Sequence, residues 1–267
     1  MIDILQTNYY HRSKTASVKV TEFFNNYCNQ NNSAIIFVSG WASTYYTWRY
    51  VIPELSELFR VFYFESREKA TAKVDNNASF YMSDMKDDLV SFINCNFSDK
   101  PFVLIGSSLG ATTILESWHS FENKPEKIVL ITPNIKMPFP SILSIAFFIP
   151  DLIVEVLRPI IFAYVNARKQ KLDKKQVAGM NEVINRGNLP RIKSSIKDLW
   201  NYNFNLKLLT TINTPCLLIT ASEDRVHSHQ DSQIILSKLP NSEYVNLKTF
   251  STTHSQTIVS ILKEWIK

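Results

Sequence analysis

One serine in this sequence lies in a setting that favours nucleophilic catalysis. Ser108 is the central residue of the segment 106–110 (GSSLG), between an apolar run and a helical pattern. A glycine-flanked serine at such a place forms a sharp strand-to-helix turn, which projects the hydroxyl above the edge of a sheet. The chain has only five glycines, and two of them flank this serine. We therefore predict Ser108 as a nucleophile, whereas its neighbour Ser107 occupies the wrong place in the motif.

An acid and a base follow the serine along the chain. Asp224 comes shortly after the apolar run 215–220, and His254 lies between the last expected strand and the last expected helix. A carboxylate just beyond a strand can reach over the edge of a parallel sheet. There it can orient a histidine that accepts the serine proton. The sequence thus predicts a triad of Ser108, Asp224 and His254.

Other residues remain as alternatives for these roles. Glu223 and Asp231 could replace Asp224. His227 and His229 form an H-x-H pair that could ligate a metal, but no further ligands accompany the pair, and an exposed loop is the simpler interpretation. We therefore expect no metal at this pair. Structural or exposed positions are expected for the remaining two candidates, His11 and His119.

Two turns could supply backbone N–H groups to a reacting oxygen. The segment 39–41 (SGW) follows the apolar run 34–39, and a turn at this place can direct an N–H group toward a carbonyl. The residue after the nucleophile supplies a second N–H group. We predict an oxyanion hole made by Trp41 and Leu109.

These segments together resemble the α/β-hydrolase superfamily, in its branch of small esterases, lipases and thioesterases. The resemblance covers residues 33–132 and 212–267. It implies a serine nucleophile, a histidine base, an acidic third residue and no cofactor. The sequence departs from the family at three places, where glycine or histidine is common: Ser39, the glycine-free segment 65–70 (ESREKA) and Thr253. A turn at 65–70 would have to be held by its charged side chains.

The expected elements would place the three residues at one edge of a sheet. Short apolar runs alternate with helical patterns, which favours an α/β fold with a mostly parallel central sheet flanked by helices. Strands are expected at 17–24, 34–39, 60–65, 101–106, 127–132, 215–220 and 243–247. Helices are expected at 45–59, 83–94, 109–120, 231–239 and 255–266.

A segment without strand patterns interrupts this alternation. We predict a core of residues 1–132 and 206–267, and a helical cap insertion at 133–205. The apolar run 137–150 is shorter than the roughly 20 residues that a membrane-spanning helix needs. Its side chains could be buried against the sheet. They could equally form an exposed lid that binds an acyl chain or makes peripheral contact with a membrane.

Composition limits the classes of partner and compartment. The chain has a net charge of +5, its Lys and Arg residues are mostly scattered, and neither a basic patch nor a nucleic-acid-binding module is apparent. The three cysteines form no CxxC pair, so a disulfide framework is not expected. The N-terminus shows no secretory signal pattern, which predicts a cytoplasmic protein. The oligomeric state is left open.

The predicted function is that of a serine hydrolase. It would cleave a carboxylic ester, with a hydrophobic acyl chain, in a small-molecule or lipid-like substrate through an acyl-enzyme. An acyltransferase, a thioesterase or a non-hydrolytic relative could use the same triad, and these alternatives stay open. A binding protein on an inactive scaffold is less consistent with an intact set of Ser108, Asp224 and His254.

Overall fold

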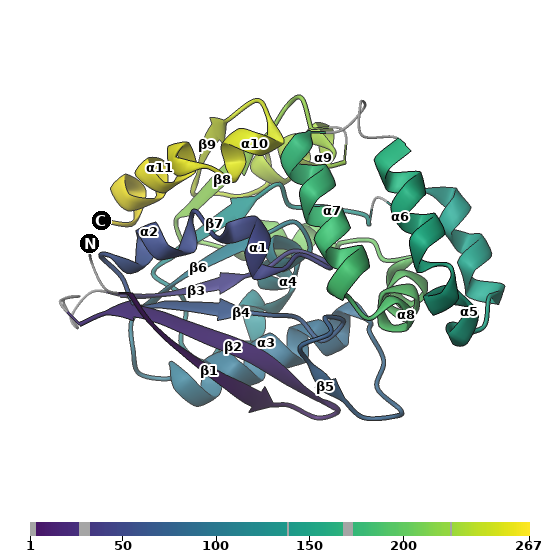
Figure 1. Ribbon diagram of the computed structural model, residues 1–267. Helices are drawn as coiled ribbons and strands as arrows, with labels where there is room; N and C mark the ends of the chain where they lie inside the picture. The colour runs from purple at the N-terminus through teal and green to yellow at the C-terminus, as the bar shows by residue number, and fades with distance from the viewer. Residues whose placement is uncertain (1–3, 27–32, 138, 168–172, 225) are drawn as a thin grey trace.

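The computed structural model describes residues 4–26, 33–137, 139–167, 173–224 and 226–267 (Figure 1). A nine-stranded sheet runs through this part of the chain in the order β1-β2-β4-β3-β6-β7-β8-β9, and β5 pairs with β2. The strands are β1 (Ile4–Arg12), β2 (Ala16–Asn25), β3 (Ala34–Val38), β4 (Val61–Phe64), β5 (Lys73–Val74), β6 (Phe102–Ser107), β7 (Lys127–Ile131), β8 (Cys216–Thr220) and β9 (Ser242–Asn246).

The central strands are parallel and buried on both faces. Every pairing from β4 through β3, β6, β7 and β8 to β9 is parallel, whereas β1, β2 and β5 are joined by antiparallel pairings. All residues of β4, β6 and β8 are buried. The predicted mostly parallel sheet is confirmed. The strands β1 and β5 were not expected, because β1 has a largely exposed, polar edge pattern and β5 has only two residues.

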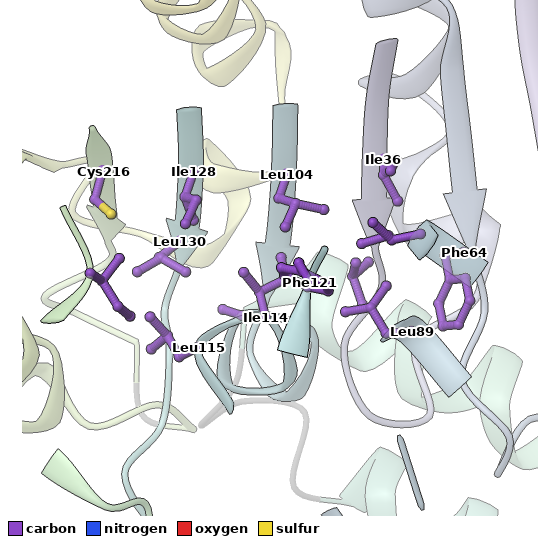
Figure 2. Packing of buried hydrophobic residues seen from close by; sticks show 14 of the residues in the cluster. Ile36, Phe64, Leu89, Leu104, Ile114, Leu115, Phe121, Ile128, Leu130 and Cys216 are labelled. Atoms are coloured by element: carbon purple, nitrogen blue, oxygen red, sulfur yellow. The ribbon is translucent and has the colours of Figure 1, made fainter. Parts of the chain in front are cut away.

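Helices cover the two faces of the sheet. Alternate strand residues face opposite ways, so Ile36, Leu104 and Leu130 pack toward one helical layer, while their sequence neighbours pack toward the other. Figure 2 shows the first of these layers, where Leu89, Ile114 and other helical side chains meet the strands. The first layer contains α3 (Met82–Asn96), α4 (Leu109–Ser117) and α9 (His229–Leu236). The second contains α1 (Tyr45–Trp48), α2 (Ile52–Ser56) and α11 (Gln256–Ile266).

A helical segment is inserted between β7 and β8. The backbones at its two ends meet, because Lys136 forms a β-bridge with Asn203 and the N–H of Phe204 donates to the carbonyl of Ile135. Its elements are η2 (Ser141–Phe148), α5 (Asp151–Val156), α6 (Arg158–Ala167), α7 (Lys174–Arg186) and α8 (Leu189–Leu199), and η4 (Leu206–Thr211) leads into β8. The division at 133 and 205 into a cap and a core stays a prediction. Among the described residues, no helix is long and apolar enough to cross a membrane.

Candidate active site

Ser108 lies in a strained turn at the carboxyl end of β6. Its backbone has φ 52° and ψ −117°, a region that L residues seldom adopt. Its N–H donates to the carbonyl of Ile131, which helps to hold the turn. A Cβ atom on Gly106 would lie 2.6 Å from the Cα of Ala111, and one on Gly110 would lie 2.2 Å from the carbonyl oxygen of Val38. Both positions therefore require glycine, and strain of this kind is typical of functional sites.

The hydroxyl of Ser108 faces the imidazole of His227. The distance from Ser108 Oγ to His227 Nε2 is 3.0 Å, and His227 Nδ1 lies 2.7 Å from Asp224 Oδ2. If Nδ1–H donates to the carboxylate, Nε2 is free to accept the serine proton. The Asp224 carboxylate is fully buried, while 14% of the His227 side chain is exposed. The three side chains thus form a continuous hydrogen-bonded chain from a carboxylate to a serine hydroxyl.

Asp224 is held in its ionised form. Burial alone would raise the pKa of this carboxyl, but the hydrogen bond and charge of His227 lower it, and the net result is a lowered pKa. The second oxygen accepts hydrogen bonds from the backbone N–H of Val226, at 2.8 Å, and from Nε2 of Gln176, at 2.7 Å. Gln176 belongs to the inserted helix α7, so the insertion contributes directly to the position of the acid.

His254, the base predicted from the sequence, has other hydrogen-bond partners. Its ring packs between Trp48 and Phe250, with ring centroids 4.2 and 3.9 Å away. Its Nδ1 is 3.0 Å from the carbonyl oxygen of Phe250 and 2.9 Å from the hydroxyl of Thr253. Burial lowers its pKa to about 4, so the ring is neutral near pH 7. Within the described chain, no hydrogen bond joins it to Ser108 or Asp224, and the predicted contact is replaced by that of His227.

The reason for this difference is the conformation of the loop before α11. A short helix, α10 (Phe250–Thr253), ends at His254 and places the aromatic ring of Phe250 against the imidazole. Lys175 of α7 donates to the carbonyl oxygens of His254, at 2.9 Å, and of Ser251, at 3.2 Å. The loop lies where the sequence indicated, but these contacts direct its histidine into an aromatic niche.

A shallow pocket adjoins His254 and is separate from the Ser108 hydroxyl. Its volume is about 130 Å³. It is lined by Tyr46, Thr47, Arg49, Tyr50, Lys174, Lys175, Ala178 and His254. Ser108, Asp224 and His227 are not among its walls.

Asn134 also contacts the nucleophile, although the sequence interpretation did not include it. Its Nδ2 donates to Ser108 Oγ at 3.0 Å. Its backbone is fixed by Thr112, whose hydroxyl donates to the Asn134 carbonyl at 2.9 Å and accepts from the Asn134 N–H at 3.2 Å. A polar residue just after the buried strand β7 was the available signal, because the carboxyl ends of parallel strands share one edge.

The loop that carries Trp41 lies against the nucleophile turn. A Cβ atom on Gly40 would lie 3.2 Å from the carbonyl oxygen of Ser107 and 3.4 Å from the Cβ of Ser108. Leu109, the other residue predicted to supply an N–H group, follows Ser108 directly and begins α4. The two predicted donors of the oxyanion hole therefore lie on segments in contact at Ser108, and their roles as donors stay a prediction.

A buried lysine supports the loop from behind. Lys69 Nζ donates to Ser39 Oγ at 2.6 Å, to the Gly40 carbonyl at 3.2 Å and to Ser66 Oγ at 2.9 Å. Burial lowers the pKa of this ammonium, and the carboxylates of Glu68 and Glu65 act in the opposite direction. A cation in this position fixes the carbonyl of the residue that precedes Trp41.

Glu68 supports the next peptide of the same loop. Its Oε1 accepts from the N–H of Ala42 at 3.0 Å and from Ser66 Oγ at 2.9 Å, and its residue is fully buried. Ala42 has φ 51°, so this contact holds a backbone conformation that alanine seldom adopts. The expectation that charged side chains would hold the glycine-free segment 65–70 agrees with these contacts.

Arg67 anchors this segment to α3. Its Nε and Nη2 each lie 2.7 Å from a carboxylate oxygen of Asp88, and both side chains are almost fully buried. The same guanidinium donates to the carbonyl oxygens of Ser79 and Asp84. A bidentate pair of this kind restricts orientation more strongly than a single contact.

The other candidates from the sequence have structural surroundings. Glu223 is exposed, and Asp231 accepts a hydrogen bond from the Ile135 N–H at 2.9 Å. Ser107 is the last residue of β6. His11 bonds to a hydroxyl of α3, and His119 to one of η4. In the described part of the chain, no cluster of three or more His, Cys, Asp or Glu side chains could hold a metal ion.

Comparison with solved structures agrees on the fold. An enol-lactonase from Burkholderia xenovorans is 12% identical, with a TM-score of 0.76, and the match covers 97% of this chain and 98% of that protein. A hydrolase from Pseudomonas aeruginosa is 13% identical with a TM-score of 0.73, covering 96% and 98%. The naproxen esterase of Bacillus subtilis is 12% identical with a TM-score of 0.72, covering 99% and 92%. No curated protein is significantly similar in sequence.

The sequence itself matches one family model. The model describes the serine aminopeptidases S33, and the match extends over residues 68–254, from the buried Glu68 to His254. It includes the nucleophile turn, the inserted helices and the acid loop. This match covers more than half of the chain, and the architecture is that of an α/β-hydrolase. The chain therefore belongs to the serine aminopeptidase S33 family of α/β-hydrolases.

Proposed function

We propose that this protein is a serine hydrolase that cleaves carboxylic esters, with Ser108 as nucleophile, His227 as general base and Asp224 as the orienting acid. The observation that carries the proposal is the chain of short hydrogen bonds from Asp224 through His227 to the hydroxyl of a serine in a strained turn. That combination of strain, buried acid and correctly directed imidazole is what an activated serine needs.

In the first half of the reaction, His227 Nε2 accepts the proton of Ser108 as Oγ attacks the carbonyl carbon. The negative charge moves to the carbonyl oxygen, where the N–H groups of Trp41 and Leu109 would stabilise it. The imidazolium, stabilised by Asp224, then gives its proton to the leaving alkoxide, and the acyl group remains on Ser108. Water deprotonated by His227 releases the acid in the second half.

An apolar cluster beside the nucleophile supports a hydrophobic acyl group. Leu109, the residue after the nucleophile, packs in one buried cluster with side chains of α3 and of the insertion. Trp41 and Phe139 pack against the same cluster. Its buried members are Phe80, Met82, Met85, Leu109, Met137 and Leu199. Because the cluster reaches the turn that holds Ser108, it would form the wall along which an acyl chain lies.

His254 is the rival base, because it occupies the loop position that the sequence resemblance assigned to that role. The hydrogen bonds favour His227, since its two ring nitrogens contact the acid and the nucleophile. Esters are favoured over peptides as substrates because the solved neighbours include an enol-lactonase and an esterase. An acyltransferase or thioesterase would use the same triad with a different acceptor or donor.

The test is covalent labelling of the full chain with a fluorophosphonate, followed by turnover of p-nitrophenyl esters of increasing acyl length. We expect labelling of the wild type, loss of label in Ser108→Ala and retention in Ser107→Ala, which changes the neighbouring hydroxyl. Ester turnover should exceed that of aminoacyl p-nitroanilides. Folded protein that takes no label would contradict an activated serine. Faster release in the presence of an alcohol, with ester product, would point to acyl transfer.

A further inference from the structure

The exposed large hydrophobic side chains of this protein are concentrated in one place. Fourteen such residues are found in the described chain, and nine of them fall between positions 142 and 164. The remaining five are Leu5 and four tyrosines. The nine are Ile142, Ile145, Phe148, Leu152, Ile153, Val156, Ile160, Phe162 and Tyr164, and we call them the insertion patch. A concentration of this kind is typical of an interaction surface and not of an ordinary solvated face.

The insertion patch occupies the outer end of the molecule. It is carried by η2, α5 and α6. Of these, α5 and α6 lie far from the sheet, with α7 between α6 and the sheet (Figure 1). No residue of η2 or α6 is buried, and α5 buries only Val154. Phe148 is 88% exposed and Leu152 is 79% exposed. The apolar excess of this segment is therefore not explained by packing on the core.

The charges around the patch identify the kind of surface that would complement it. Its three elements have two carboxylates, and both are neutralised, Asp151 by Lys193 and Glu155 by Arg158. The whole segment 133–205 has eleven Lys and Arg against five Asp and Glu, a net charge of +6, whereas the rest of the chain has eighteen against nineteen. The positive charge of the protein thus resides on the same segment as its exposed apolar side chains.

A row of aromatic rings connects the patch to the nucleophile. Phe147, next to the exposed Phe148, contacts Trp200 with ring centroids 5.1 Å apart. Trp200 stacks on Phe139 at 6.2 Å, and Phe139 contacts Trp41 at 5.1 Å. The row ends at the loop that lies against Ser108. An apolar molecule held at the patch would therefore lie at one end of a row of aromatic side chains whose other end is beside Ser108.

We propose that the insertion patch docks on the surface of an anionic lipid bilayer, with Phe148 and Leu152 entering the interface. A segment that combines exposed apolar side chains with a net positive charge binds such a surface by burial and by attraction to anionic headgroups together. A second copy of the chain fits less well, because two segments of charge +6 would be brought face to face. Docking does not depend on hydrolysis, although delivery of a lipid ester along the aromatic row rests on the proposed function.

The test is co-sedimentation of the full chain with vesicles, in the Ser108→Ala background so that lipid is not consumed. One set of vesicles is phosphatidylcholine alone, and the other contains equal parts phosphatidylcholine and phosphatidylglycerol. We expect stronger binding to the second set, weakened by added salt. The double substitution Phe148→Ser with Leu152→Ser should reduce binding roughly tenfold or more. The matched control, Leu5→Ser with Tyr10→Ser on the edge strand β1, should bind like its parent.

Two results would overturn the proposal. One is a folded parent protein that does not bind the anionic vesicles, or that binds equally with and without the patch substitutions. The other is a parent protein that does not bind vesicles but forms a dimer in size-exclusion chromatography, which the same two substitutions dissociate. The patch would then bind a second copy of the chain. Because binding is measured without turnover, failure of the esterase assay would leave this result unaffected.

Discussion

Two loops at the same edge of the sheet each present a histidine, and their surroundings differ. In the loop after β8, His227 contacts the Asp224 carboxylate through one ring nitrogen and the Ser108 hydroxyl through the other. The loop after β9 gives His254 two aromatic rings and a backbone carbonyl, with only 5% of the residue exposed. One imidazole is therefore placed to exchange a proton, and the other is packed as a neutral ring. Position at the sheet edge is shared, and the partners decide the chemistry.

The largest effect on kcat is expected when each histidine is replaced, in turn, by a side chain that does not titrate. We expect His227→Ala to lower kcat for an ester by roughly 10⁴-fold or more, because the serine loses its base. His254→Phe retains an aromatic ring between Trp48 and Phe250 and should leave kcat nearly unchanged. Steady-state kinetics on both folded variants decides the matter. The opposite order of effects would return the role of base to His254.

A slightly smaller loss is expected when the acid beside His227 is altered. Asp224→Asn should lower kcat by roughly 10³- to 10⁴-fold, because an amide no longer fixes Nδ1 as the protonated nitrogen. The control is Glu223→Gln, which removes a neighbouring exposed carboxylate and should have little effect. Rates of fluorophosphonate labelling give an independent readout, and they should fall with kcat. Equal effects of the two substitutions would contradict the assignment of Asp224.

The contrast between the loops also shows where prediction from sequence ends. The sheet and the turn at Ser108 could be predicted, because strand periodicity and the glycines of the turn are local properties of the chain. The direction of the His254 ring depends on Trp48 and Lys175, which come from distant segments. From the sequence, His227 was expected to be an exposed loop residue. Its contact with Ser108 joins residues 119 positions apart, and no local pattern indicates it.

The same limit applies to Asn134 and to the insertion. A single asparagine after a strand has no distinctive spacing, and only the meeting of β6 and β7 places it at Ser108. The apolar run 137–150 was compatible with either burial or exposure, since hydrophobicity alone does not state what covers it. The exposure of Phe148 became evident only from the arrangement of η2, α5 and α6.

The aromatic surroundings of His254 predict a dependence of stability on pH. Its pKa is about 4 in the folded protein, against an ordinary value of 6.5. Between these pH values the unfolded chain binds a proton at His254 that the folded protein does not bind. The contribution of His254 to the free energy of unfolding is therefore complete above pH 6.5 and is lost as the pH falls toward 4. The contribution is at most about 3 kcal/mol. Chemical denaturation between pH 6.5 and 4 should show a smaller loss of unfolding free energy in His254→Phe than in the wild type. The same pH dependence in both proteins would contradict a neutral, buried ring.

The smallest effect concerns the loop of Trp41, which Lys69 supports. Lys69→Gln keeps a donor but removes the cation that binds the Gly40 carbonyl and Ser39 Oγ. We expect kcat to fall by roughly ten- to a hundredfold with little change in KM, because misplaced donors affect the transition state more than binding. Lys73→Gln changes an exposed lysine four residues later, in β5, and serves as the control.

A purely structural role for Lys69 would give a different pattern. The melting temperature would fall, while kcat per folded molecule would stay near that of the wild type. Glu68→Gln provides a second variant, because its amide oxygen can still accept from the Ala42 N–H. We expect it to retain more activity than Lys69→Gln. If both variants kept full kcat, Lys69 and Glu68 would stabilise the fold without positioning Trp41. The contacts of His227 with Asp224 and Ser108 would then be sufficient to account for catalysis.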